Sequence, residues 1–79
     1  MPEITWDIKK TLGIIGEGSG EWKKEVNIVS WNERAPKIDI RPWDADHKKM
    51  GKGITLSKDE VLKLKEILNS LDMDTLEIG

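Results

Sequence analysis

Hydrophobic and polar residues alternate near the start of the chain with the period of two that is typical of a β-strand. The alternation begins at Ile4 and Trp6 and becomes less regular toward Ile15. Residues 16–20 then hold three Gly and one Ser, which is the composition of a flexible turn. The pattern therefore predicts a first strand over about residues 3–15.

The same alternation returns twice, over residues 21–31 and 36–43, and a short apolar run at 53–57 predicts a fourth strand. Pro42 has no N–H to donate, so it is expected at a strand end or edge. Each longer strand has a face of β-branched residues, and we assign that face to the core. The residues expected to point inward are Val26, Ile28, Ile38 and Ile40.

A helix is expected to follow over about residues 58–70. Ser57 and Glu60 have the spacing of a capping box, in which each side chain bonds the backbone N–H of the other residue. An acidic tail of uncertain order follows at 72–79. The apolar stripe of the helix is wide, which fits either a broad sheet surface or contact with a second copy of the helix. The residues expected at a dimer interface are Val61, Leu64, Ile67, Leu68 and Leu71.

These elements predict a single α+β domain over residues 1–79, a four-stranded antiparallel meander with one C-terminal helix on one face. A monomer of 79 residues buries a limited core, and the chain has no Cys for disulfides. Tight packing or self-association must then supply the remaining stability.

Charge is distributed unevenly along the chain. The net charge is −2, which taken whole argues against a nucleic-acid binder. However, residues 23–58 hold nine basic and five acidic groups, hence +4, whereas residues 59–79 hold two basic and six acidic, hence −4. The positive charge is therefore concentrated on the middle strands and the loop that follows them.

Basic and aromatic side chains are interleaved on the face expected to be open. Lys37, Arg41 and Trp43 share one face of their strand, and Lys23 and Trp31 share the same face of the strand before it. Cations for phosphates and flat rings for bases are what single-stranded nucleic acid requires. The alternative is that Trp31 and Trp43 are buried or form a subunit contact. The other two tryptophans, Trp6 and Trp22, are expected to pack in the core.

Catalytic, metal and membrane functions find little support. There is one His and no Cys, so no nucleophilic dyad or zinc site is expected, and no cofactor is implied. Asp44 and Asp46 have a spacing common in turns. The N-terminus lacks the pattern of a signal peptide, and no apolar run could span a membrane, so we expect a cytoplasmic protein without enzymatic activity.

Two motifs together resemble a known family. Residues 38–41 read Ile-Asp-Ile-Arg, and residues 51–57 read Gly-Lys-Gly-Ile-Thr-Leu-Ser directly before the predicted helix. Over about residues 22–68 the chain resembles the C-terminal domain of the transcriptional coactivator positive cofactor four (p15), most closely its bacterial YdbC-type branch. The resemblance implies a curved four-stranded sheet, a homodimer built through the helices, and single-stranded DNA bound across the sheet.

The resemblance also implies roles for individual residues. Arg41 matches the family's phosphate-contacting arginine, and Trp43 matches the aromatic residue that ends the same strand. Lys52 matches the basic residue before the Gly-Ile strand, and Trp31 matches the aromatic residue that ends the second strand. Together with the charge pattern, this gives the expected nucleic-acid-binding residues as Lys23, Trp31, Arg34, Lys37, Arg41, Trp43, Lys49 and Lys52.

We therefore expect a homodimer that binds single-stranded DNA with little sequence preference, in transcription or in DNA replication or repair. If the protein is bacterial, it is expected at the nucleoid. One alternative is a protein–protein adaptor for a transcription or repair protein, whose acidic C-terminal region suits a basic partner. Another is a binder of single-stranded RNA that uses the same surface.

Overall fold

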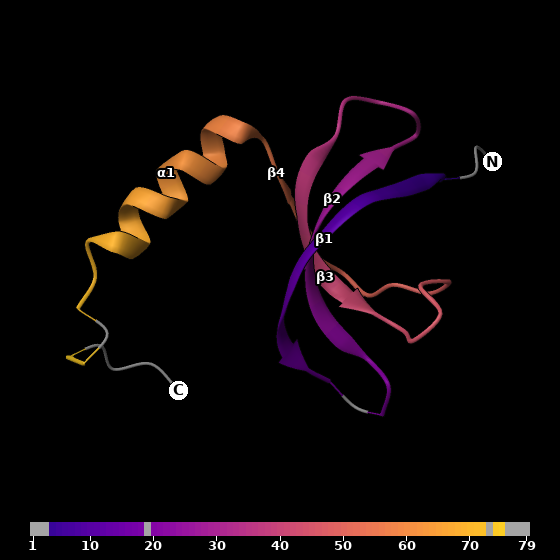
Figure 1. Ribbon diagram of the computed structural model, residues 1–79, viewed down its shortest axis with the longest axis horizontal. Coiled ribbons are helices and arrows are strands. Elements are labelled where there is room, and N and C mark those ends of the chain that lie inside the picture. The colour runs from indigo at the N-terminus through magenta and orange to yellow at the C-terminus, as the bar shows by residue number, and fades with distance from the viewer. Residues whose placement is uncertain (1–3, 19, 73, 76–79) are drawn as a thin grey trace.

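The computed structural model describes residues 4–18, 20–72 and 74–75. An antiparallel sheet in the order β1-β2-β3-β4 is followed by one C-terminal helix, which confirms the predicted fold class (Figure 1). Residue 3 of the predicted first strand and residues 73 and 76–79 of the predicted tail lie outside the described residues. The elements are β1 (Trp6–Glu17), β2 (Lys23–Trp31), β3 (Lys37–Trp43), β4 (Ile54–Leu56) and α1 (Lys58–Asn69).

β1 is longer at its C-terminal end than the sequence pattern predicts. The expectation that glycine-rich residues 16–20 end the strand is wrong, because Gly16 and Glu17 still pair with Lys24 and Lys23 of β2. A glycine in a strand marks a bulge or a close approach rather than a certain end. β2 begins at Lys23 rather than at residue 21, so the connection between the two strands shifts along the chain without becoming shorter.

Three irregularities in the β1–β2 pairing bend the sheet. The register shifts between Ile8 and Lys10, between Thr11 and Gly13, and between Ile14 and Gly16. Each shift inserts an extra β1 residue, and such bulges bend a strand and increase its right-handed twist. Figure 1 shows the outcome as an open, strongly twisted sheet in which the ends of neighbouring strands splay apart.

This curvature reverses the predicted inside and outside of the sheet. The face of Val26, Ile28, Ile38 and Ile40, here called the aliphatic face, is only half-buried, so its assignment to the core is wrong. The sheet instead closes around its other face, here called the tryptophan face. Its residues include Trp6, Glu25, Asn27, Val29, Trp31, Asp39, Arg41 and Trp43, of which Asn27, Val29, Asp39 and Trp43 are fully buried.

The helix begins as the sequence predicts. The Ser57 hydroxyl accepts the Glu60 N–H at 3.3 Å, and the Glu60 carboxylate accepts the Ser57 N–H at 2.9 Å. α1 touches the sheet only near β3 and β4 and projects away from it (Figure 1). No side chain of α1 is buried within one copy of the chain.

Candidate nucleic-acid interface

Three indole rings form the centre of the tryptophan face. Trp6 lies between the other two, with its ring centroid 6.4 Å from that of Trp31 and 5.8 Å from that of Trp43. Both pairs are tilted, at 51° and 53°, a geometry that favours aromatic contact. The indole N–H groups of Trp31 and Trp43 are buried without a hydrogen-bond partner among the described residues, so packing alone orients these rings.

Arg41 lies over this cluster and is held by a buried carboxylate. Its Nε and Nη2 donate to the two oxygens of Asp39 at 2.6 and 2.8 Å, and Asp39 is fully buried. The guanidinium carbon lies 4.5 Å from the centroid of the Trp31 ring, within the range of a cation–π contact. Thr55 of β4 also donates to Asp39, at 2.8 Å. The Arg41 guanidinium is therefore a cation that Asp39 and the Trp31 ring hold in place.

A groove of about 500 Å³ opens beside these side chains. Most of its wall is apolar or aromatic, with a few polar groups, and its volume is in the range of small-ligand sites. Trp6 and Trp31 are half-buried, so each ring keeps part of its surface exposed. The residues that line the groove are Ile4, Trp6, Trp31, Asn32, Arg41, Met50 and Thr55.

Two glycines place Lys52 beside Arg41. A Cβ on Gly53 would overlap the Arg41 side chain and the Ile40 carbonyl, and a Cβ on Gly51 would overlap the Pro42 ring. Only glycine lets the backbone approach β3 this closely. Lys52, between the two glycines, is exposed, so its ammonium group can reach a phosphate.

The loop before β4 is held by hydrogen bonds within itself and by contacts of His47 with the sheet. The Asp44 carboxylate accepts the N–H groups of Lys48 and Lys49 at 2.8 and 3.0 Å. These hydrogen bonds, that of Lys49 foremost, hold the pKa of Asp44 below its usual range. Farther along, Nε2 of His47 lies 2.8 and 2.9 Å from the two oxygens of buried Glu25, and its ring packs on Trp43.

The predicted binding residues fall into separate groups. Trp31 and Arg41 come together at the groove, and Gly53, the residue after Lys52, lies against Arg41. Lys23 lies at the opposite end of β2 from Trp31, in a hollow that it shares with three carboxylates. Lys37 lines the junction of sheet and helix. Of the other predicted cations, Arg34 follows β2 and Lys49 lies in the loop before β4, both exposed.

The expected roles of two tryptophans are exchanged in the structure. Trp43 is fully buried under Trp6 and against His47, so the expectation that its ring is exposed for stacking on a base is wrong. Trp6, expected in the core, is half-buried and lines the groove. The reason is the curvature of the sheet, which closes over Trp43 but leaves Trp6 on the edge strand.

Sequence reasoning did not assign Trp6, Asn32, Met50 or Thr55 to the site. Trp6 pairs directly with Trp31 across β1 and β2, but the bulges between these strands prevent this register from being counted along the sequence. Thr55 faces Asp39 across β3 and β4, within one of the family motifs, and that motif was the available signal. Asn32 and Met50 lie in connections and carry no periodic signal.

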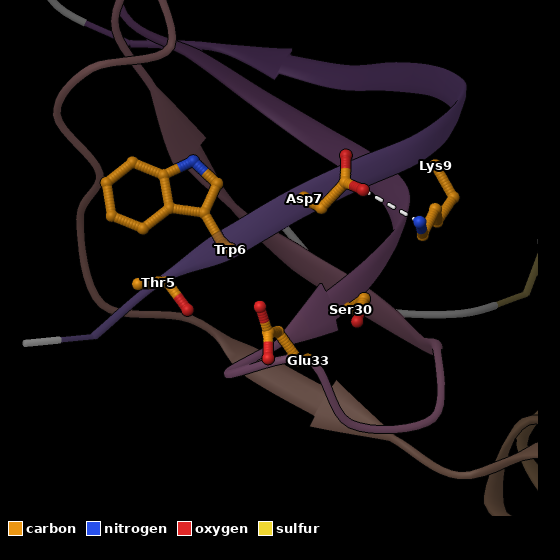
Figure 2. Close-up of a pocket in the computed structure, with 6 residues that line it drawn as sticks. All are labelled: Thr5, Trp6, Asp7, Lys9, Ser30 and Glu33. Carbon is orange, nitrogen blue, oxygen red and sulfur yellow. Dashed lines mark ion pairs between the residues drawn. The ribbon is translucent and has the colours of Figure 1, made fainter.

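A further hollow, of about 420 Å³, lies beside β1 and the end of β2 (Figure 2). The carboxylates of Asp7 and Glu33 line it, and Asp7 is paired with Lys9 at 2.7 Å. Figure 2 shows Trp6 and Asp7 leaving β1 in different directions. Because two carboxylates repel phosphate, the groove beside Arg41 is the better candidate for a nucleic-acid chain.

Searches of the described residues for other kinds of site give two negative results. They contain no helix long and apolar enough to cross a membrane. Within the same part of the chain, no cluster of three or more His, Cys, Asp or Glu side chains could hold a metal ion.

An open curved sheet with a C-terminal helix, and a fixed cation over a half-buried indole, is an arrangement suited to binding nucleic acid. Comparison with known proteins identifies the family. The sequence model of the transcriptional coactivator p15 (PC4) family matches residues 19–67, so the chain belongs to this family, a non-enzymatic family of DNA-binding proteins and transcription cofactors. An uncharacterized protein of Treponema pallidum (strain Nichols) is 38% identical over 72 residues, 91% of this chain and 85% of that protein.

Proposed function

We propose that this protein is a homodimer that binds single-stranded DNA with little sequence preference, in transcription or in DNA replication or repair. The observation that carries the proposal is the groove in which Trp6 and Trp31 expose ring surface beside the fixed guanidinium of Arg41. Stacking on exposed rings is worth about 1–3 kcal/mol per base and accepts any base. Family membership supports nucleic acid as the ligand.

The proposed path of the strand runs from the groove toward Lys52. Bases stack on the two groove indoles, and Arg41 and Lys52 neutralise adjacent phosphates. Arg34 and Lys49, both exposed, extend the positive surface. Trp43 supports Trp6 from below and does not touch the strand.

The proposed dimer is supported by apolar surface that a single copy of the chain leaves exposed. Leu62, Leu64, Ile67, Leu68 and Leu71 are 37% to 57% exposed in a single chain. A helix of 12 residues is marginal in water unless its apolar face is packed. A second copy of α1 on this stripe, with the half-exposed aliphatic face behind it, supplies that packing.

Titration with oligo-dT tests the ligand. We expect quenching of Trp fluorescence, because two of the four indoles line the groove. The logarithm of the binding constant should fall with the logarithm of salt concentration, with a slope of about −0.7 per phosphate neutralised. An unchanged fluorescence together with no salt-dependent binding would contradict the proposal.

Paired variants separate the groove from the rest of the molecule. Trp31→Ala should weaken binding by about 1–3 kcal/mol, the stacking energy of one base. Trp22→Ala is the matched control, because Trp22 is also half-buried but precedes β2 and lies outside the groove. Equal losses in both variants would show that indole removal acts through the fold.

Single-stranded RNA is the second candidate, because stacking and phosphate contacts do not by themselves distinguish ribose from deoxyribose. Competition of oligo-U against oligo-dT decides between the two. A protein-adaptor role for the same surface predicts a partner that remains bound after nuclease treatment.

A further inference from the structure

The polar groups around the groove are mostly hydrogen-bond donors. Asn32 shows this most clearly, because its Oδ1 accepts the backbone N–H of Thr5 at 2.9 Å. A backbone N–H can only donate, so this contact fixes the orientation of the amide and leaves its NH₂ as the group without a partner among the described residues. Asn32 also has a φ of 51°, a conformation that few side chains other than Asn and Asp adopt readily.

Arg41 supplies the second set of donors. Its Nε and one N–H of Nη2 are used by Asp39, and Nη1 lies 3.4 Å from the sulfur of Met50. Guanidinium has five N–H bonds and no acceptor, so further N–H bonds remain on Nη1 and Nη2. The ion pair and the Trp31 ring prevent the guanidinium from turning away.

Acceptors are scarce at the same place. Asp39 is fully buried and both of its oxygens already receive hydrogen bonds, from Arg41 and from Thr55. The remaining side-chain acceptors in the groove lining are the Thr55 hydroxyl oxygen, the second lone pair of Asn32 Oδ1 and the weak Met50 sulfur. The unpaired N–H groups of Arg41 and Asn32 therefore outnumber the side-chain acceptors that remain in the groove lining.

We propose that this groove selects keto bases, thymine, uracil and guanine, over the amino bases adenine and cytosine. The inference rests on the proposed function and specifies which nucleic-acid sequences the groove favours. Lysines outside the groove hold the backbone of the nucleic acid. Each base therefore enters the groove with the edge that is farthest from its sugar. That edge carries an oxygen at C4 of thymine or C6 of guanine and an NH₂ group in cytosine or adenine. An oxygen accepts from Asn32 and Arg41, whereas an NH₂ group faces other donors.

The experiment compares bases that have the same ring and differ at this edge. Short strands of stable abasic nucleotides carry one probe base, either inosine against adenine or uracil against cytosine. We expect inosine and uracil to bind about threefold to tenfold more tightly than their partners, the ratio that one net hydrogen bond gives. The ratio should be the same on a ribose and a deoxyribose backbone, because the groove reads the base.

Two variants assign the effect to Asn32. Asn32→Asp keeps the oxygen that accepts the Thr5 N–H but replaces the NH₂ group with an acceptor, and Asp tolerates the positive φ. The inosine-to-adenine ratio should fall to about one or below it, while the added charge weakens both strands equally and cancels in the ratio. Asn32→Gly removes the donor without adding charge and suits the same backbone conformation, so its ratio should also fall.

Each outcome has one meaning. A keto preference that both variants reduce supports the inference. Equal binding of all probe bases by the wild-type protein overturns the inference and leaves the proposed function standing. A preference unchanged in both Asn32 variants overturns the assignment to this groove. If oligo-dT itself does not bind, the proposed function fails, and the inference fails with it.

Discussion

Trp43 shows how one buried ring can determine a surface that it does not reach. It is fully buried between Trp6, whose centroid is 5.8 Å away, and the His47 ring at 5.6 Å. Trp6 in turn contacts Trp31, so the exposed rings of the groove rest on Trp43. The family resemblance predicts that Trp43 contacts the ligand, because Trp43 follows the binding arginine on β3. Its burial shows instead that the ring packs in the core.

Replacement of Trp43 by Ala should therefore unfold much of the domain. The expected loss is about 3–5 kcal/mol in the free energy of unfolding, as for other fully buried tryptophans. Urea denaturation followed by circular dichroism measures it. Trp31→Ala, at a half-buried ring, should lose clearly less stability, and a Trp43→Ala protein as stable as the wild type would show that the ring is not part of the core.

Asp39 and Arg41 form the second arrangement at the residue scale. The motif Ile-Asp-Ile-Arg predicts that both side chains leave β3 on one face, and alternation along the strand makes this certain. It does not predict which residue is buried. The structure shows the Asp39 carboxylate fully buried and the Arg41 side chain 15% exposed. The buried carboxylate therefore positions the guanidinium.

Asp39→Ala should lower the free energy of unfolding by about 3–5 kcal/mol, because it leaves an arginine largely buried without its partner. Asp39→Asn keeps the shape and one acceptor oxygen but replaces the other oxygen with an NH₂ donor. It should unfold less readily than the alanine variant, and it should bind oligo-dT more weakly because the guanidinium loses its bidentate partner. The control is Asp7→Ala, which breaks the exposed pair with Lys9 and should change stability by less than about 1 kcal/mol. Equal effects at Asp39 and Asp7 would contradict the positioning role.

At the scale of elements, irregular segments position the site. The bulges of β1 bring Trp6 opposite Trp31, and Gly51 and Gly53 let the chain before β4 lie against β3. The sequence predicts the regular elements well because capping and alternation are local. It does not predict bulges, whose position depends on how two strands settle against each other.

The loop that carries Lys48 and Lys49 should loosen in acid. The pKa of Asp44 is lowered in the folded protein by the hydrogen bonds it accepts. Its stabilising effect is therefore complete above the unfolded pKa, about 3.9, and is lost as the pH falls through the lower folded value. Asp44→Asn should be less stable than the wild type at neutral pH, with the difference vanishing below the folded pKa.

Unfolding by urea at a series of pH values between neutral and about pH 3 measures this difference. Asp46→Asn is the control, because it removes the same charge from the same loop but its carboxylate accepts no hydrogen bond from the described residues. A difference between wild type and Asp44→Asn that stays constant with pH would show that the carboxylate charge is not responsible.

At the scale of the whole molecule, one copy leaves two apolar surfaces uncovered. No residue of α1 is buried, and the aliphatic face of the sheet is half-exposed. The buried hydrophobic residues of the sheet, Val29 and Trp43, lie instead on the tryptophan face. A second copy packed on α1 would complete the core, and it would leave the groove beside Arg41 open in both copies.

Ile67→Glu tests this assembly. The side chain is 57% exposed in one copy, so the substitution should be tolerated by the monomer but should weaken a dimer built through α1. Sedimentation at increasing protein concentration should show a dimer for the wild type and a monomer for the variant. Asn69→Glu adds the same charge to α1 on the side opposite Leu64 and Leu71, so a dimer built on that side should persist. A wild type that remains monomeric at all concentrations would contradict the dimer.

The sequence by itself determined the order of the elements, the capped start of α1 and the pairing of positions on each strand face. These features depend on alternation, capping and spacing, which are local properties of the chain. Only the tertiary structure decided which face is buried, because three bulges curl the sheet around the tryptophan face. The same curvature exchanged Trp6 and Trp43, so the residues that can meet a ligand follow from the shape of the whole sheet.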